Sequence, residues 1–272
     1  MKIAHIGPIS QLDLVEEYSD FFLAEAEFVL KSEVLTSFYR RMSESNHLVI
    51  LDNGIWYAGD PLPTADLVEA AERIKATFIM APDKIDDYKV TAQRTEEFIS
   101  ETLFPRSQII GVIQGSSMEE KFRCIDHFCE LGLRLSLPAN DTPEVAHLDN
   151  STLDSGTRIM LKRMFVLDQL EQVGYGSYFK ESDKLLFLTG LGNPIEVAIN
   201  SRSWIYGADS SACFQCGRNN VLFSRQFGCE RPQVKLDFSE KFDTEARMRT
   251  RFNLQIMNFW LNRKSKGGEL KC

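Results

Sequence analysis

The chain has 272 residues, of which 43% are hydrophobic and 26% are charged, a composition typical of a folded globular protein. Its formal net charge of −8 argues against a protein that coats nucleic acid, because such binding depends on Lys and Arg, but it does not exclude a local basic groove. The sequence holds no apolar run long enough to cross a membrane, and residues 1–7 lack the layout of a secretion signal, so we expect a cytoplasmic protein without a membrane partner.

Short apolar runs recur along the chain, and amphipathic helical patterns separate them. The runs are mostly apolar without alternation, as expected for strands that are buried on both faces. In chain order they cover residues 2–6, 47–51, 77–81, 108–114, 133–137, 184–189 and 204–208. The helical patterns cover residues 64–76, 91–103, 117–131 and 151–173. Strands that alternate with helices predict a parallel sheet with right-handed crossovers.

Seven strands in a chain of this length favour a (β/α)8 TIM-type barrel, an α/β fold, with one strand unassigned. That strand lies either in residues 221–227 or in residues 21–30. A doubly wound open sheet is the alternative, although Gly7-Pro8-Ile9-Ser10 stands where a dinucleotide-binding fold carries its glycines. We expect a single domain over residues 1–272, with the barrel core over about 1–227 and a short basic C-terminal extension over 228–272.

Polar residues stand at the carboxyl ends of these runs, where the active site of a barrel collects. They are Asp52, Asn53, Asp83, Gln114, Gly115, Ser136, Thr189, Gly190 and Asp209. Turn residues are common at strand ends, so each position alone is weak evidence. Three carboxylates and a glutamine that all follow apolar strands nevertheless favour a shared site.

Paired carboxylates suit chemistry at the anomeric carbon of a sugar, where one attacks C1′ and the other carries a proton for the base that leaves or enters. Two neighbouring acids also separate each other's pKa values, which gives them different roles. A further acid and an amide can hydrogen-bond the Watson–Crick edge of a purine. Two acids alone fit a glycosidase or a nucleoside hydrolase equally well.

Five segments in this order resemble the tRNA-guanine transglycosylase superfamily. They are Leu51-Asp52-Asn53-Gly54, Met80-Ala81-Pro82-Asp83, Gly111-Val112-Ile113-Gln114-Gly115, Phe187-Leu188-Thr189-Gly190-Leu191-Gly192-Asn193-Pro194, and Ile205-Tyr206-Gly207-Ala208-Asp209. After the last of them, Gly217-Arg218-Asn219 follows at the spacing that the family shows. The order of the segments and this spacing carry the resemblance.

The resemblance implies a barrel that exchanges a guanine in nucleic acid for another base. It implies that Asp209 is the nucleophile, that Asp52 is the general acid/base, and that no cofactor takes part. The residues that would bind the substrate are Asp83 and Gln114, which read guanine, together with Gly115, Asn53, Ser136, Thr189 and Gly190. Those that would contact the nucleic acid are Arg218, Asn219 and Arg225.

The departures from the family concern the substrate and the metal. Leu135-Ser136-Leu137-Pro138 stands where the family's tRNA enzymes carry a Gly-Gly, and residues 238–271 contain neither the Cys nor the His of the family's zinc site. Cys213 and Cys216, with Cys229, supply at most three ligands, so we expect free thiols rather than bound zinc.

The compact chain most resembles the virus-encoded DNA-guanine transglycosylases, which place 7-deazaguanines in DNA. We therefore expect DNA and a free 7-deazaguanine base as substrates. The same chemistry on tRNA is the first alternative, and a non-catalytic subunit that binds nucleic acid is the second. Arg247, Arg249 and Arg251 in the basic C-terminal third could line a groove for nucleic acid. Related barrels often pair, so a homodimer is one possibility.

Overall fold

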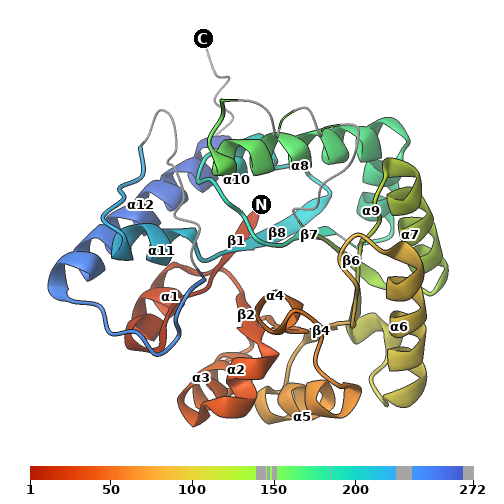
Figure 1. Cartoon of the computed structure of the whole chain (residues 1–272), viewed down its shortest axis with the longest axis horizontal. Coiled ribbons are helices and arrows are strands. Elements are labelled where there is room, and N and C mark those ends of the chain that lie inside the picture. The colour runs from red at the N-terminus through yellow and green to blue at the C-terminus, as the bar shows by residue number, and fades with distance from the viewer. Residues whose placement is uncertain (139–144, 146–147, 149–151, 185, 225–234, 266–272) are drawn as a thin grey trace.

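The computed structural model describes residues 1–138, 145, 148, 152–184, 186–224 and 235–265. Within them, parallel strands form one eight-stranded sheet: β1 (Lys2–His5), β2 (Phe22–Glu25), β3 (Val49–Asp52), β4 (Phe78–Met80), β5 (Ile109–Val112), β6 (Arg134–Leu137), β7 (Leu186–Leu188) and β8 (Ile205–Ser210). Hydrogen bonds join the strands in the order β1-β8-β7-β6-β5-β4-β3-β2. The sheet curls until its end strands β1 and β2 lie next to each other, inside an outer layer of helices (Figure 1). The predicted (β/α)8 TIM-type barrel is confirmed.

The outer layer contains the longer helices, and two short helices follow β3 and β7. The longer ones are α1 (Leu12–Tyr18), α2 (Ala26–Lys31), α3 (Glu33–Glu44), α5 (Thr64–Ile74), α6 (Tyr88–Glu101), α7 (Met118–Glu130), α8 (Ser155–Gln172), α9 (Tyr175–Glu181), α11 (Ala212–Arg218) and α12 (Thr244–Ser265). The short ones are α4 (Ile55–Ala58) and α10 (Glu196–Ile199), and two 3-10 turns are η1 (Ile9–Gln11) and η2 (Arg106–Gln108). Among the described helices, none has the length and apolar character needed to cross a membrane.

Helix starts follow local capping chemistry. The side chain of Ser117 accepts a hydrogen bond from the Glu120 N–H and begins α7, close to the predicted start. Asp87 does the same for Val90 at the start of α6. Such caps satisfy backbone N–H groups that have no partner inside the helix, which is why the helix starts could be read from the sequence.

The unassigned strand is β2, in the second of the two predicted segments. All four residues of Phe22–Glu25 are buried, and the strand pairs with β3. The described part of the other segment, residues 221–224, contributes no strand to the sheet. Because α2 begins directly after Glu25 and adds further apolar residues, the strand and the helix read as one continuous stretch in the sequence.

The seam between β1 and β2 is closed by the residues that precede β2. The Ile3 N–H donates to Asp20 Oδ2 at 2.9 Å, and the Asp20 N–H donates to the Ile3 carbonyl oxygen at 2.8 Å. The His5 N–H donates to Ser19 Oγ at 3.0 Å. These bonds satisfy the free edge of β1 and bring the carboxyl end of β2 beside those of β1 and β8.

Aromatic side chains fill the amino-terminal half of the barrel interior. Phe21, Phe78, Phe187 and Tyr206 form a cluster in which neighbouring ring centroids lie 5.0 to 6.2 Å apart. The guanidinium of Arg134 lies 5.0 Å from the centroid of the Phe78 ring. The barrel is therefore a packed core at this end, and its polar side chains gather at the other.

The C-terminal helix α12 belongs to the outer helical layer. It packs against α11 so closely that a Cβ added to Gly217 would lie 2.2 Å from Thr250 Oγ1. Three arginines in its first turns bond to their surroundings: Arg247 pairs with Asp13, Arg251 with Glu17, and Arg249 donates to the Gly217 carbonyl oxygen. In this structure, these arginines hold α12 against α1 and α11.

Candidate active site

The carboxyl ends of four strands bring four acidic side chains together. Glu25 ends β2, Asp52 ends β3, Asp83 follows β4 and Asp209 lies near the end of β8. Glu25 and Asp52 are paired in register across the parallel ladder, so their side chains project to the same face of the sheet. The charge of Asp209 acts on both of them, and the charge of Asp83 acts on Asp52. The predicted pair Asp52 and Asp209 thus lies in one cluster, to which the structure adds Glu25.

Asp209 is held by the loop that follows β7. Its side chain is buried, and the Gly190 N–H lies 3.2 Å from each of its carboxylate oxygens. Gly190 has a φ of 71°, a conformation that other residues adopt only with strain. Thr189 is half-buried, and its carbonyl oxygen accepts a hydrogen bond from Arg163 Nη2 at 2.8 Å. Thr189 and Gly190 therefore act through their backbone, as a donor loop for Asp209.

A buried ion pair supports this loop from outside the barrel. Arg163 on α8 and Glu196 on α10 have fully buried side chains, and Arg163 Nε lies 3.3 Å from Glu196 Oε1. The other carboxylate oxygen, Oε2, accepts the Gly192 N–H at 3.1 Å. The two charges fix the backbone of the loop at both ends, and this fixes the N–H that meets Asp209.

Asp52 has the environment of a proton carrier. Its Oδ1 accepts the Gly54 N–H at 2.8 Å. Burial raises the pKa of the Asp52 carboxyl to about 7, and the nearby carboxylates of Asp209 and Asp83 add to the rise against the effect of the Gly54 bond. A carboxyl whose pKa lies near neutrality can both give and take a proton, as a general acid/base must.

Glu25 is the residue that the sequence reading missed. Its side chain is only 7% exposed, and its Oε2 atom is buried without a hydrogen-bond partner. Burial, and then the charges of Asp52 and Asp209, raise the pKa of the Glu25 carboxyl well above its usual range. The signal was present, because an apolar run over residues 21–24 ends at this acid, but it could only be used once β2 was assigned.

The three residues predicted to read or flank the base form one hydrogen-bonded network. Asp83 Oδ1 accepts Asn53 Nδ2 at 2.7 Å, and Asp83 Oδ2 accepts Gln114 Nε2 at 2.5 Å. Asn53 Nδ2 also donates to the Ala81 carbonyl oxygen at 2.7 Å. Burial raises the pKa of Asp83 despite these two amide bonds, which act in the opposite direction. Each carboxylate oxygen can accept a second hydrogen bond, so the network can still receive the N–H groups of a purine.

Gly115 and Ser136 complete the predicted set in different ways. Gly115 has a φ of 152°, and a Cβ there would lie 2.8 Å from the Glu120 Cβ, so the close packing requires glycine. Its carbonyl oxygen accepts the buried ammonium of Lys121 at 2.7 Å. Ser136 is fully buried on β6, and its Oγ has no hydrogen-bond partner. Ser136 Oγ and Glu25 Oε2 are thus polar atoms that a bound molecule could satisfy.

Two of the three predicted nucleic-acid contacts make local bonds at the end of α11. Arg218 pairs with Glu240, and Asn219 Nδ2 donates to the Gln215 carbonyl oxygen at 2.7 Å at the end of α11. Arg225 lies outside the described residues. These contacts of Arg218 and Asn219 secure α11 and the segment before α12, and a role of the two residues in binding nucleic acid stays a prediction.

An exposed aromatic side chain stands close to the cluster in the chain. Trp56 lies on α4, which begins directly after the Asp52-Asn53-Gly54 turn, and it is 63% exposed. Lys235 Nζ donates to the Trp56 carbonyl oxygen at 2.9 Å and lies 5.9 Å from the centroid of the Trp56 ring. An exposed ring beside a cation is the combination on which nucleic-acid bases stack.

Two of the three cysteines that could have bound zinc are buried. Cys213 and Cys216 lie in α11, outside any disulfide, and burial raises the pKa of the Cys213 thiol well above its usual range. The third candidate, Cys229, lies outside the described residues. Among the described residues, no group of three His, Cys, Asp or Glu side chains is arranged to hold a metal ion.

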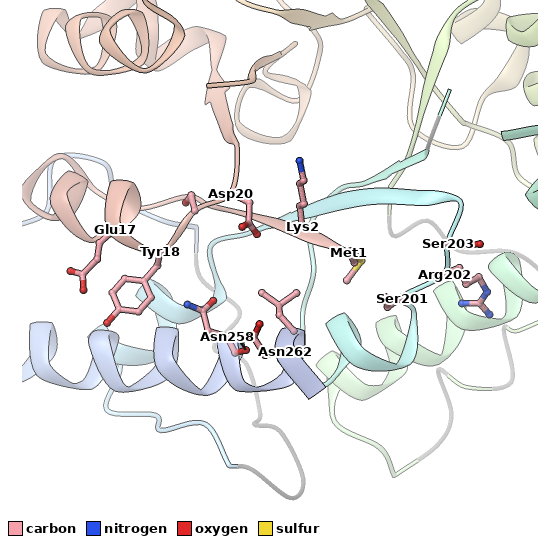
Figure 2. A pocket seen from close by; sticks show the side chains of 12 residues that line it. Met1, Lys2, Glu17, Tyr18, Asp20, Ser201, Arg202, Ser203, Asn258 and Asn262 are labelled. Carbon is pink, nitrogen blue, oxygen red and sulfur yellow. Dashed lines mark hydrogen bonds between the residues drawn. The ribbon is translucent and has the colours of Figure 1, made fainter. Parts of the chain in front are cut away.

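A pocket of about 580 Å³ lies at the opposite end of the barrel, around the start of β1 (Figure 2). Residues 17–20 from the end of α1 and the loop before β2, residues 201–203 before β8, and residues of α12 line it. It is far from the carboxyl ends of the strands, and barrels carry their chemistry at the carboxyl ends, whereas the amino ends contribute to stability. We therefore assign the candidate site to the four acids and not to this pocket.

In comparisons with known proteins, no family model matches the sequence, and no curated protein matches it either.

Proposed function

We propose that the protein exchanges a guanine in nucleic acid for a free 7-deazaguanine base, with Asp209 as nucleophile and Asp52 as general acid/base. The observation that carries the proposal is the proximity of a buried, hydrogen-bonded Asp209 to Asp52, whose carboxyl has a pKa of about 7. A pair of acids with separated roles is what substitution at an anomeric carbon requires.

In the first half of the reaction, the Asp209 carboxylate attacks C1′ of the target nucleotide. The bond between C1′ and N9 breaks, its electron pair goes to the guanine, and Asp52 donates a proton to the departing base. In the second half, the Asp52 carboxylate removes the N9 proton of the incoming base. N9 then attacks C1′, the ester bond to Asp209 breaks, and both acids return to their starting states.

Base recognition falls to the network around Asp83. Its carboxylate oxygens face two amide donors and have acceptor capacity left for the N1–H and the 2-amino group of a guanine. Gln114 Oε1 accepts the Asp86 N–H at 3.0 Å, which fixes the orientation of the amide. A rigid arrangement of this kind favours exchange between guanine-like bases over simple hydrolysis.

DNA is the proposed polymer, as the resemblance of the sequence implies, but the catalytic residues act at C1′ and are equally suited to DNA and tRNA. A base in a duplex must leave the stack before Asp209 can reach its sugar, at a cost of a few kcal/mol. Trp56, exposed on α4, would stack on a neighbouring base and offset part of this cost.

Base exchange tests the proposal. The protein is incubated with radiolabelled guanine or 7-deazaguanine and with duplex DNA, single-stranded DNA or total tRNA in separate reactions. Label in DNA is the expected result. Label in tRNA alone would keep the chemistry and change the polymer. Loss of guanine without uptake of label would indicate a hydrolase, and no reaction with any polymer would contradict the proposal.

A further inference from the structure

Glu25 has no task in the two steps described above, although it lies in the same cluster. It is paired in register with Asp52, it is buried, and its Oε2 has no hydrogen-bond partner. The charged groups that act on it are Asp52 on β3, Asp209 on β8 and Glu27 on α2, and all three are acidic. The charge of Glu25 in turn acts on the phenol of Tyr39 on α3. Burying a carboxyl among other acids is energetically unfavourable, and such groups are often found at functional sites.

The hydrogen bonds of the cluster favour a proton on Glu25. Asp209 accepts the Gly190 N–H, and Asp52 accepts the Gly54 N–H. Glu25 Oε2 accepts none. Hydrogen bonds from N–H groups stabilise a carboxylate, and neighbouring negative charges destabilise it. Glu25 therefore stays neutral, whereas Asp209 acts as a carboxylate and Asp52 exchanges its proton.

We propose that Glu25 is a positioning residue: as a neutral carboxylic acid, it turns its unpartnered Oε2 toward Asp52, its neighbour in register, and donates a hydrogen bond to that carboxyl once Asp52 is ionised. This inference rests on the proposed function. Its effect falls on the second half of the reaction. Once Asp52 has given its proton to the departing guanine, it is an anion beside other carboxylates that must persist until the incoming base arrives. A neutral donor beside it stabilises that anion, whereas a third ionised carboxyl would destabilise it.

The test compares Glu25→Leu, which removes the donor, with Glu25→Gln, which keeps a neutral donor of similar shape. In Glu25→Leu, the covalent adduct should form, but its release by a 7-deazaguanine base should slow about tenfold, the effect of one hydrogen bond to a charged group. The adduct should then accumulate during turnover. Glu25→Gln should release its adduct within about threefold of the wild-type rate. Glu27→Gln is the matched control and should behave like the wild type.

The pH dependence separates this role from a structural one. Loss of the donor raises the pKa of Asp52, so the release step in Glu25→Leu should regain speed as the pH is raised, whereas a misfolded site would not. Equal release rates in Glu25→Leu and the wild type, or a defect in Glu25→Gln as large as that in Glu25→Leu, would overturn the inference. If the wild type itself forms no adduct, the proposed function fails first, and the two failures are distinguishable.

Discussion

Individual carboxyl groups carry the proposed chemistry, and their burial makes the stability of the folded protein depend on pH. The pKa of Asp52 is raised to about 7 chiefly by burial, and burial also raises the pKa of Asp83 and of Glu25. A group whose pKa is higher in the folded state binds a proton that the unfolded chain releases. Its contribution to stability is therefore greatest at low pH and is lost as the pH rises through the pKa of the folded state.

The first prediction concerns Asp52→Asn. Between about pH 4 and pH 7 the wild type loses the stability that protonated Asp52 contributes. The variant has no titrating group at this position, so its stability should not change for this reason. The variant should match the wild type near pH 4 and exceed it by about 1 to 3 kcal/mol in the free energy of unfolding at pH 8. Urea denaturation at both pH values measures this.

Asp237→Asn is the control of opposite sign. Hydrogen bonds from Ser239 lower the pKa of the Asp237 carboxyl, so this group contributes stability above its unfolded pKa and loses it as the pH falls. Its replacement should therefore cost stability at pH 8. An Asp52→Asn variant that is less stable than the wild type at pH 8 would show that burial does not raise the pKa of Asp52.

A second prediction concerns base recognition. Asp83→Ala removes the carboxylate that receives the purine N–H groups and that accepts hydrogen bonds from Asn53 Nδ2 and Gln114 Nε2. We expect kcat/KM for the free base to fall at least 100-fold, because a site built to hydrogen-bond a base loses its partner groups. Steady-state exchange at varied base concentration measures it. Asp60→Ala removes an exposed carboxyl and should leave kcat/KM unchanged; an equal loss there would contradict the assignment.

At the scale of elements, the loop after β7 depends on charges supplied by two helices. Arg163→Met leaves Glu196 as an uncompensated buried charge, which typically costs 3 to 5 kcal/mol. We expect a loss of about that size in the free energy of unfolding, measured by urea denaturation. Arg218→Met breaks an ion pair with Glu240 in which the arginine is half exposed, and it should cost less than about 1 kcal/mol. Similar losses in the two variants would contradict this account of the loop.

The sequence predicted those helices and strands that are marked by a pattern of neighbouring residues. Buried runs located most strands, and the Ser117 cap located the start of α7. Glu25 was missed because β2 was predicted only as one of two alternatives without an end point, since the apolar residues of α2 follow it without a break. The pair of Arg163 and Glu196 could not be predicted, because it exists only after α8 and α10 pack together. Local patterns place residues at strand ends, whereas contacts between distant helices depend on the folded chain.

At the scale of the whole molecule, the barrel separates two functions between its ends. The aromatic cluster around Phe187 packs the amino half, and the acids lie at the carboxyl ends of the strands. A nucleic-acid substrate should therefore bind over the carboxyl end, where α4 exposes Trp56, and not at the pocket around the start of β1.

The prediction at this scale compares two exposed apolar residues. Trp56→Ala should weaken binding of a guanine-containing oligonucleotide about tenfold or more, the usual effect of removing one stacking ring. Leu103→Ala removes a fully exposed side chain from the segment that leads into β5, at the amino end, and should leave the affinity unchanged. Fluorescence anisotropy of a labelled oligonucleotide measures both. A larger loss in Leu103→Ala than in Trp56→Ala would place the polymer at the wrong end of the barrel.

The most direct test of the central claim is to detect the covalent intermediate. The protein is mixed with a guanine-containing oligodeoxynucleotide in the absence of free base, quenched in denaturant, digested and analysed by mass spectrometry. The account predicts a sugar adduct on the peptide that contains Asp209, present in the control Glu17→Gln and absent from Asp209→Asn. An adduct that persists in Asp209→Asn, or that maps to another residue of the cluster, would contradict it.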